Sequence, residues 1–531
     1  MNQQLFLSLL TMSFLWIGSQ IPLYLFGSVM PLIYSDIGGY DHYVWLVIGY
    51  LIPNAALCPF VGALSDMFGR HSVAACGQVL LILGPIITAT ANQMNIAIAG
   101  QVFSGTGAGL NELISLAGTA ELVPPKKRGT YVGAIVFTIL PFCPSVLWAQ
   151  MIAKASSWRF VGIVVGVWNF IGLLLVGICY KPPRNSSLNR KRMEILREVD
   201  YIGGFLSTGG VLLFMMGMQW GAQQYSWDSV HVLVPFILGL AGVAGFFFWE
   251  IKFATYPMVP RALFSRDKRT MVASLLLTFW SGGNYFVLLL IWPTQCYDVY
   301  GNDPIGIGVR SLPIGFGIIF GAAFTLMLFP IVKGRTTALM VFSCALMTAG
   351  TGAMSVGTPS NISTLWGIIT VASIAVGSVI IPCSIIAQLV APVELIGTIT
   401  AITLSIRYIG GAIAFTVYDN VLSRKLHGYI LTVVAPAIVE KGIVAPTQQD
   451  TIGALATLAA QARFVELKGL IASSPAIEYK DLAYDVVVGA TQEAYALAFR
   501  YPYWISAAFG VLSLSCSLFL KDIRTVLKSE D

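Results

Sequence analysis

Glu112 and Arg407 are charged residues well inside long apolar stretches of the chain, where a charge can do chemistry. Glu112 lies in the stretch near residues 95–118, and Arg407 lies in the stretch near 397–422. A charge inside a bilayer costs free energy, so it usually has a partner or a role. Arg407 falls roughly 15 Å along its predicted helix, too deep for its side chain to reach the surface easily. We expect it either to face a cavity, where it meets an acidic substrate or a carboxylate, or to form a structural pair inside a helix bundle.

Glu112 is the only carboxylate well inside the first six apolar stretches. It falls roughly 25 Å along the fourth predicted helix, toward the side that the loop charges assign to the cytosol. A poorly hydrated carboxylate holds a proton more readily than one in water, so Glu112 could carry protons. The alternative is that Glu112 pairs with a charged turn at Asp66 and Arg70.

That turn belongs to the decapeptide GALSDMFGRH, residues 62–71, which joins two apolar stretches. Such a turn must lie at the membrane surface, because lipid cannot satisfy its backbone groups. We expect Gly62 and Gly69 to let the helix ends approach closely. Asp66 and Arg70 can pair with neighbouring helix ends or their dipoles.

Glu121 and Arg128 stand at the same cytosolic end, after the fourth apolar stretch. Together with Asp66 and Arg70 they could form a latch that holds two helix ends together in one conformation of a moving protein. The alternative is a charged turn of the kind that any polytopic membrane protein has.

Several polar and aromatic residues lie within apolar stretches and are candidates for lining a cavity that takes a bulky, mostly apolar ligand. The polar candidates are Asn54, Asn111, Asn169, Asn284 and Gln388, and the aromatic ones are Trp148, Trp168, Trp280 and Tyr285. Each of them could instead serve packing or bonding between helices.

The composition indicates an integral membrane protein. Of 531 residues, 56% are hydrophobic and 11% are charged, with a mean hydropathy of +0.78. Soluble domains carry about 25% charged residues. The net charge of +6 comes from a few short loops, so it is a topology signal and predicts no nucleic-acid partner. The eight cysteines form no CxxC pair and the four histidines are scattered, so we expect no metal and no cofactor.

We predict an all-α protein with about fourteen membrane spans of roughly 20 residues each. They lie near 5–33, 43–61, 72–91, 95–118, 131–153, 160–180, 201–220, 230–250, 271–293, 306–331, 337–357, 363–390, 397–422 and 502–520. Lys and Arg concentrate in one set of alternate loops, whereas the other short loops carry only Lys154, Arg159 and Arg310. The first set is therefore cytosolic, and both termini lie in the cytosol.

The predicted organisation has four parts: residues 1–180, a six-helix half; 181–200, a basic cytosolic linker; 201–250, two inserted helices; and 251–531, a second six-helix half. The last part includes a long outer loop, 424–500, with helix-like spacing at 448–471 and 484–499. We expect short helices resting on the outer surface, which act as a lid or have no role.

The decapeptide resembles the signature loop of the major facilitator superfamily, G-x-L-[SA]-D-x-x-G-R-[KR], with His71 at the last basic position. The turn Lys333–Arg335 resembles its degenerate copy in the second half. Fourteen spans resemble the layout of the drug:proton antiporters. Finer features resemble the fungal trichothecene efflux pump group, which is close to the fungal siderophore transporters: Ser35–Gly39, Glu121–Pro124, Trp158–Phe160 and Arg407–Ala412.

This resemblance implies a monomeric transporter that exports a toxic or secondary metabolite across the plasma membrane by proton antiport with alternating access. A vacuolar or vesicular membrane is an alternative location. Proton-coupled uptake of iron–siderophore complexes is an alternative function, and a transporter-like nutrient sensor is another. The fourth span lacks the arginine usual before Q-G-x-G, and the fifth keeps only Pro144 of G-P-x-x-G-G. No phosphate-binding loop and no hydrolase motif is present, so neither ATP-driven transport nor an enzyme is expected.

Overall fold

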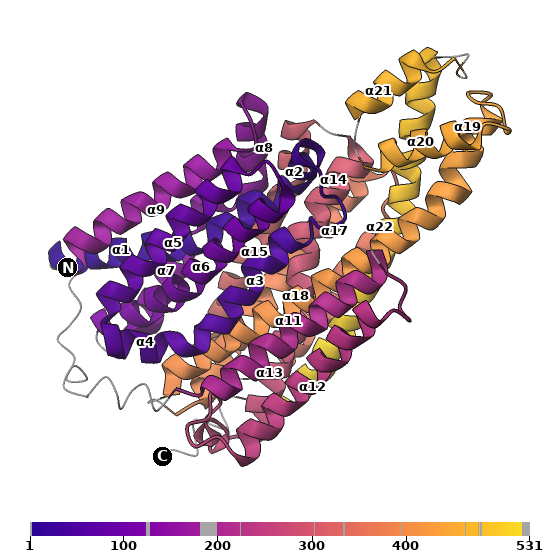
Figure 1. Ribbon diagram of the computed structural model, residues 1–531. Coiled ribbons are helices and arrows are strands. Elements are labelled where there is room, and N and C mark those ends of the chain that lie inside the picture. Colours follow the sequence, from indigo (N-terminus) through magenta and orange to yellow (C-terminus); the bar gives the residue numbers. More distant parts are fainter. Residues whose placement is uncertain are drawn as a thin grey trace.

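The computed structural model describes residues 3–123, 128–180, 199–223, 225–301, 303–332, 335–392, 395–461, 464–475, 477 and 480–522. Every regular element in these ranges is a helix, and most of the helices run side by side along one direction (Figure 1). The predicted all-α membrane fold is therefore confirmed. Most of the predicted linker, residues 181–198, lies outside the described residues.

The helices before the linker pack against one another, and we call them the N-terminal group. They are α1 (Gln3–Gly27), α2 (Met30–Ile37), α3 (Trp45–Leu57), η1 (Cys58–Phe60), α4 (Val61–Phe68), α5 (Arg70–Thr90), α6 (Met94–Leu122), α7 (Arg128–Phe137), η3 (Leu140–Phe142), α8 (Ser145–Ala155) and α9 (Phe160–Cys179).

The helices from residue 261 onward pack together as the C-terminal group. They are η5 (Arg261–Phe264), α13 (Lys268–Phe286), η6 (Val287–Ile291), α14 (Trp292–Tyr300), α15 (Pro304–Ile331), α16 (Thr336–Ala353), η7 (Met354–Val356), α17 (Ile362–Val390), α18 (Ile396–Tyr429), η9 (Ile430–Val434), α19 (Ala435–Glu440), α20 (Gln449–Ala460), α21 (Phe464–Ser473) and α22 (Lys480–Ser517). The two groups meet along α3 with α18 and along α8 with α15. The predicted domain boundaries at residues 180, 200 and 250 stay predictions.

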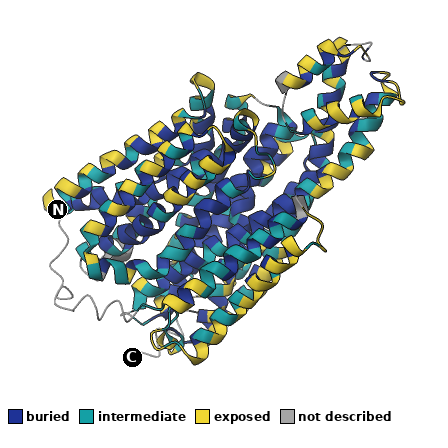
Figure 2. Ribbon diagram, in the orientation of Figure 1, coloured by how far each residue is buried: buried dark blue, intermediate teal, exposed yellow. Residues whose placement is uncertain are grey.

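Two helices, α11 (Tyr201–Gln223) and α12 (Val230–Lys252), form a hairpin that packs against α18. The outer face of α12 is exposed (Figure 2) and carries large apolar side chains such as Ile237 and Phe247. A helix with an apolar face turned away from the protein is suited to lipid.

Twelve helical segments among the described residues are long and apolar enough to cross a membrane. The predicted spans near 95–118 and 502–520 fall in α6 and α22, which are long helices packed among the others but are not in that set. A count of fourteen spans therefore stays a prediction.

The outer loop is more regular than we predicted. Helix α18 continues to Tyr429, well past the expected end near residue 422, and α22 begins at Lys480 and runs without a break into the last span. Helices α19–α21 project from the end of the bundle opposite the two termini (Figure 1). The π-turns η6 and η9 each end two residues before a proline, Pro293 or Pro436, whose missing N–H interrupts the regular helical ladder.

Glycines let α13 and α18 cross closely. A Cβ added at Gly410 of α18 would lie 2.2 Å from the Phe279 carbonyl oxygen of α13, and one at Gly282 would lie 2.6 Å from the Arg407 carbonyl oxygen. No side chain fits at such a distance, so the backbones can approach only because these residues are glycine.

We predict that Gly410→Ala destabilises the protein by about 1–3 kcal/mol, because the methyl group must displace backbone of α13. Thermal unfolding of the purified protein in detergent measures this change. The matched control is Gly367→Ala in α17, where an added Cβ meets no atom within 4 Å. Equal melting temperatures for the two variants would contradict the close packing of α13 on α18.

Candidate functional site

Glu112 of α6 and Arg407 of α18 face each other between the two groups of helices. Arg407 Nη2 lies 3.5 Å from Glu112 Oε1. The Glu112 side chain is fully buried, and 15% of the Arg407 side chain is exposed. We expected Arg407 either to meet an acidic substrate or a carboxylate, or to form a structural pair, and its partner in the structure is the Glu112 carboxylate. Proton carriage by Glu112 stays a prediction. The alternative pairing of Glu112 with the turn at Arg70 is not what the structure shows.

Two further side chains bond to the Glu112 carboxylate. The Tyr408 hydroxyl donates to Oε2 at 2.8 Å, and Asn54 Nδ2 donates to the same oxygen at 3.5 Å. Asn54 reaches Glu112 because α3 and α6 touch: a Cβ added at Gly109, one turn before Glu112, would lie 2.9 Å from the Asn54 carbonyl oxygen. A cation and two neutral donors therefore satisfy the buried carboxylate.

A pair of tyrosines adds a second bridge between the groups. The hydroxyls of Tyr24 of α1 and Tyr285 of α13 lie 2.8 Å apart, and the Tyr24 hydroxyl donates to Gln20 Oε1 at 3.1 Å. Both tyrosines lie within electrostatic reach of Arg407. We call these residues the central polar cluster: Gln20, Tyr24, Asn54, Glu112, Tyr285, Arg407 and Tyr408.

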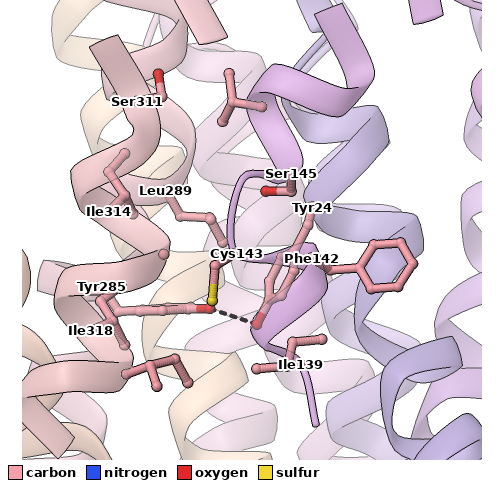
Figure 3. A pocket seen from close by; sticks show the side chains of 13 residues that line it. Tyr24, Ile139, Phe142, Cys143, Ser145, Tyr285, Leu289, Ser311, Ile314 and Ile318 are labelled. Carbon is pink, nitrogen blue, oxygen red and sulfur yellow. Dashed lines mark hydrogen bonds between the residues drawn. The ribbon is translucent and has the colours of Figure 1, made fainter. Parts of the chain in front are cut away.

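A cleft with about 480 Å³ of empty space, part of it open to the outside, borders this cluster. Tyr24 and Tyr285 form its polar edge, and the Cys143 sulfur lies beside their hydrogen bond (Figure 3). The remaining walls are mostly apolar and come from both groups, for example Phe142 and Ile314. The cleft therefore presents apolar walls and hydroxyl groups at one edge.

Of the five polar residues predicted to line a cavity, Asn54 joins the central polar cluster, and none lines this cleft. The others bond between or within helices. Asn284 Oδ1 accepts hydrogen bonds from Thr351 of α16 and Ser506 of α22, and Gln388 Nε2 donates to Thr400 of α18.

Asn111 and Asn169 likewise serve helix packing. Asn111 lies against Gly77 of α5 and can bond there to Ala74 O and Gln78 N. Asn169 packs on Gly18 of α1 and donates to Val165 O.

Of the four aromatic candidates, Tyr285 lines the cleft. Trp168 stacks on Phe14, with ring centroids 4.4 Å apart. Trp148 donates to Pro141 O, and Trp280 packs against Phe509. Indole rings commonly pair with such neighbours, so their position within a span did not indicate a ligand site.

The charged turn joins α5 to the end of α6. Arg70 forms an ion pair with Glu121, and both belong to the N-terminal group. A Cβ added at Gly62 or at Gly69 would meet no atom within 4 Å, so close approach of helix ends explains neither glycine. Gly69 has φ +84°, a backbone conformation that favours glycine. The side chains of Asp66 and Arg128 lie outside what the structure describes, as do Lys333 and Gly334 of the second-half turn.

Polar contacts also hold the start of α13 to the residues that follow α22, at the same end of the molecule as the termini. Asp267 caps α13 by accepting from Arg269 N and Thr270 N, and Lys521 Nζ lies 3.3 Å from its carboxylate. Burial raises the pKa of Asp267, but hydrogen bonds from Thr270 and the charge of Lys521 outweigh it, so the pKa lies below its ordinary value.

The family model of the fungal trichothecene efflux pump matches residues 4–530, nearly the whole chain. The chain belongs to this family. The trichothecene efflux pump TRI12 of Fusarium sporotrichioides is 24% identical over 94% of this chain and 83% of its own length. The transporter prx5 of Penicillium rubens is 27% identical over 96% and 89%. The match to gkaD of Penicillium citrinum, at 28% identity, spans 56% of this chain and only half of gkaD.

Solved structures of transporters share the fold of this efflux-pump family member. A bacterial homologue of the human lysosomal transporter Spinster superposes with a TM-score of 0.60 at 13% identity, over 99% of this chain and 98% of that one. A D-xylose–proton symporter superposes with a TM-score of 0.57 at 14% identity, over 98% of each chain. The predicted major facilitator fold is confirmed.

Sequence reasoning missed three members of the central polar cluster: Gln20, Tyr24 and Tyr408. Tyr408 follows Arg407 directly, and a hydroxyl next to an intramembrane cation is a usable signal. Gln20 and Tyr24 lie four residues apart on α1, so they share one helix face. Their proximity to Glu112 depends on how the helices pack, which the spacing of residues along the sequence does not show.

We predict that Arg407→Met alone destabilises the protein by about 3 kcal/mol or more, because it leaves a buried carboxylate without its cation. The double variant Glu112→Gln/Arg407→Met should regain part of this loss. Melting temperatures of the wild type, both single variants and the double variant in detergent form the thermodynamic cycle. A double variant whose loss equals the sum of the single losses would contradict a direct pair.

We predict that Asp267→Asn destabilises the protein by about 0.5–1 kcal/mol at pH 7, because asparagine keeps the helix cap but loses the charge that Lys521 and the N-terminus of α13 stabilise. The pKa of Asp267 is lower in the folded state than in the unfolded state, where it is about 4. The ionised carboxylate therefore stabilises the fold fully at pH values above about 4. This stabilisation is lost as the pH falls through the folded-state pKa. The melting-temperature gap between wild type and variant should thus narrow below about pH 4. Asp228→Asn, at an exposed carboxylate, is the control and should show no such gap. A gap for Asp267→Asn that persists unchanged at low pH would contradict this linkage.

Proposed function

We propose that this member of the efflux-pump family exports a weakly polar secondary metabolite or toxin in exchange for protons. The observation that carries the proposal is the buried Glu112–Arg407 pair, which joins the two groups of helices beside a cleft lined by both. Family membership supports efflux as the class of transport.

The pair can couple a proton to a change of conformation. Glu112 belongs to the N-terminal group and Arg407 to the C-terminal group, so the pair must break if the two groups rock apart. Protonation removes the charge of Glu112 and with it the attraction that opposes separation. Tyr408 and Asn54 can still bond to a protonated carboxyl, so the site remains satisfied in both states.

The cleft supports an uncharged substrate. Its walls are mostly apolar, and the nearest charges already neutralise each other. A charged substrate would have to displace one member of that pair at a large cost in desolvation. An uncharged molecule with hydroxyl or carbonyl groups can instead bond to Tyr24 and Tyr285 after separating their hydroxyls.

The Arg70–Glu121 pair has a separate role in this proposal. It acts as a latch that holds α5 to the end of α6 at the cytosolic face in one conformation. Asp66 and Arg128 belong to the same proposed latch. The protein works as a monomer in the plasma membrane with both termini in the cytosol.

We predict that deleting the gene in its source organism causes a secondary metabolite to accumulate inside cells and decline in the medium. Mass spectrometry of both fractions measures this. Wild-type protein should restore export, whereas Glu112→Gln should reduce the export rate at least about tenfold, as expected for loss of a proton-transferring group. The matched control Glu250→Gln changes a carboxylate of α12 that accepts a hydrogen bond from Met258 N, and it should restore export.

The same strains test the alternative of siderophore uptake. Growth on ferric siderophores as the sole iron source should be unaffected by the deletion. Normal metabolite export together with lost growth on siderophore iron would overturn the proposal of efflux. Full export by Glu112→Gln at wild-type protein levels would overturn proton coupling through Glu112.

A further inference from the structure

A second cavity, of about 440 Å³ of partly open space, lies at the outer end of the molecule. It is bounded by α14, the end of α20 and the first half of α22. Its residues Tyr297 and Asp298 follow Tyr285 along a continuous helical path by roughly 20 Å, so this cavity is separate from the central polar cluster. The wall consists of Tyr297, Asp298, Gly301, Ala459, Tyr484, Val488, Thr491, Gln492 and Tyr495.

Asp298 places a carboxyl group in this cavity, among the tyrosines of its wall. It is partly buried, and no residue that the structure describes donates a hydrogen bond to it or forms an ion pair with it. Two cations of the outer end are engaged elsewhere. Lys154 lies 3.8 Å from Asp303, and Arg310 donates to Tyr300 O. An ionised carboxylate confined without a counter-ion is costly, so it takes up either a proton or a cation from outside.

Aromatic rings surround this carboxylate. Tyr297, Tyr484 and Tyr495 line the cavity. Tyr34 and Tyr40, from the N-terminal group, lie within electrostatic reach of Asp298. Ring faces attract cations, and carboxylates with several aromatic neighbours suit quaternary and primary ammonium groups. Lys468 Nζ lies 4.7 Å from the centroid of the Tyr484 ring, so one ring of this wall already takes part in a cation–π contact.

We propose that this outer cavity binds a compact organic ammonium ion, with Asp298 as the counter-ion and the tyrosine rings as the walls. A divalent metal ion fits the cavity poorly, because Ca²⁺ takes six to eight oxygen ligands and Mg²⁺ six, whereas the wall supplies one carboxylate. An anion is excluded by the charge of Asp298. The site goes beyond the proposed export function, since it binds a cation apart from the cleft that serves the exported molecule.

The test uses the full-length protein in detergent and tetramethylammonium chloride as the probe. Isothermal titration calorimetry, with sodium chloride at the same ionic strength as reference, should show one saturable site. Asp298→Asn should weaken binding at least about tenfold, as expected for a lost charge-assisted contact. Tyr297→Phe, which keeps the ring face, should bind like the wild type, and Tyr297→Leu should bind more weakly.

The matched control is Asp303→Asn, which removes an exposed carboxylate of the same outer end and should leave binding unchanged. If Asp298→Asn does not fold, the comparison of Tyr297→Leu with Tyr297→Phe decides. Equal affinity of Asp298→Asn and wild type, equal affinity of the two Tyr297 variants, no saturable binding by the wild type, or an equal response to sodium would each overturn the proposal. None of these outcomes depends on whether the protein exports a metabolite.

Discussion

The buried ion pair between Glu112 and Arg407 is the interaction on which the rest of the structure depends. Each residue alone would place an uncompensated charge in an apolar bundle, and each comes from a different group of helices. The pair is therefore stable only while the two groups are together, and the groups lose a strong attraction when it breaks. Such a contact responds both to protonation of Glu112 and to separation of the two groups of helices.

Close packing of the surrounding helices positions the side chains of Glu112 and Arg407. Gly282 and Gly410 let α13 and α18 cross closely at the level of Arg407, and Gly109 lets α6 approach α3 one turn before Glu112. Tyr408 and Asn54 then satisfy the carboxylate, while Tyr24 and Tyr285 link the cluster to an apolar cleft. The ion pair, the hydrogen bonds to its carboxylate and the apolar cleft therefore lie at one level of the bundle, and both groups of helices contribute to them.

The sequence predicted the membrane fold and the family, because hydropathy, loop charges and the decapeptide are local signals. It also identified Glu112 and Arg407, since an intramembrane charge is conspicuous by itself. Their partnership was left open because it depends on how two groups of helices pack, which no spacing encodes. For the same reason Asn54 could not be told from Asn111 or Asn284, which bond between helices of one group. The regular helices of the outer segment, where α22 runs unbroken from Lys480, were also underestimated, because short apolar runs do not show whether they continue into a span.

The most direct test of the central claim is a distance measurement between the two groups by double electron–electron resonance. Spin labels replace exposed Phe68 on α4 and Ile331 on α15 in a background free of other reactive cysteines. Glu112→Gln removes the charge as protonation would. The account predicts that this variant shifts the distance distribution away from that of the wild type at neutral pH, toward the distribution that the wild type shows at low pH. Identical distributions for wild type and Glu112→Gln at every pH would contradict it.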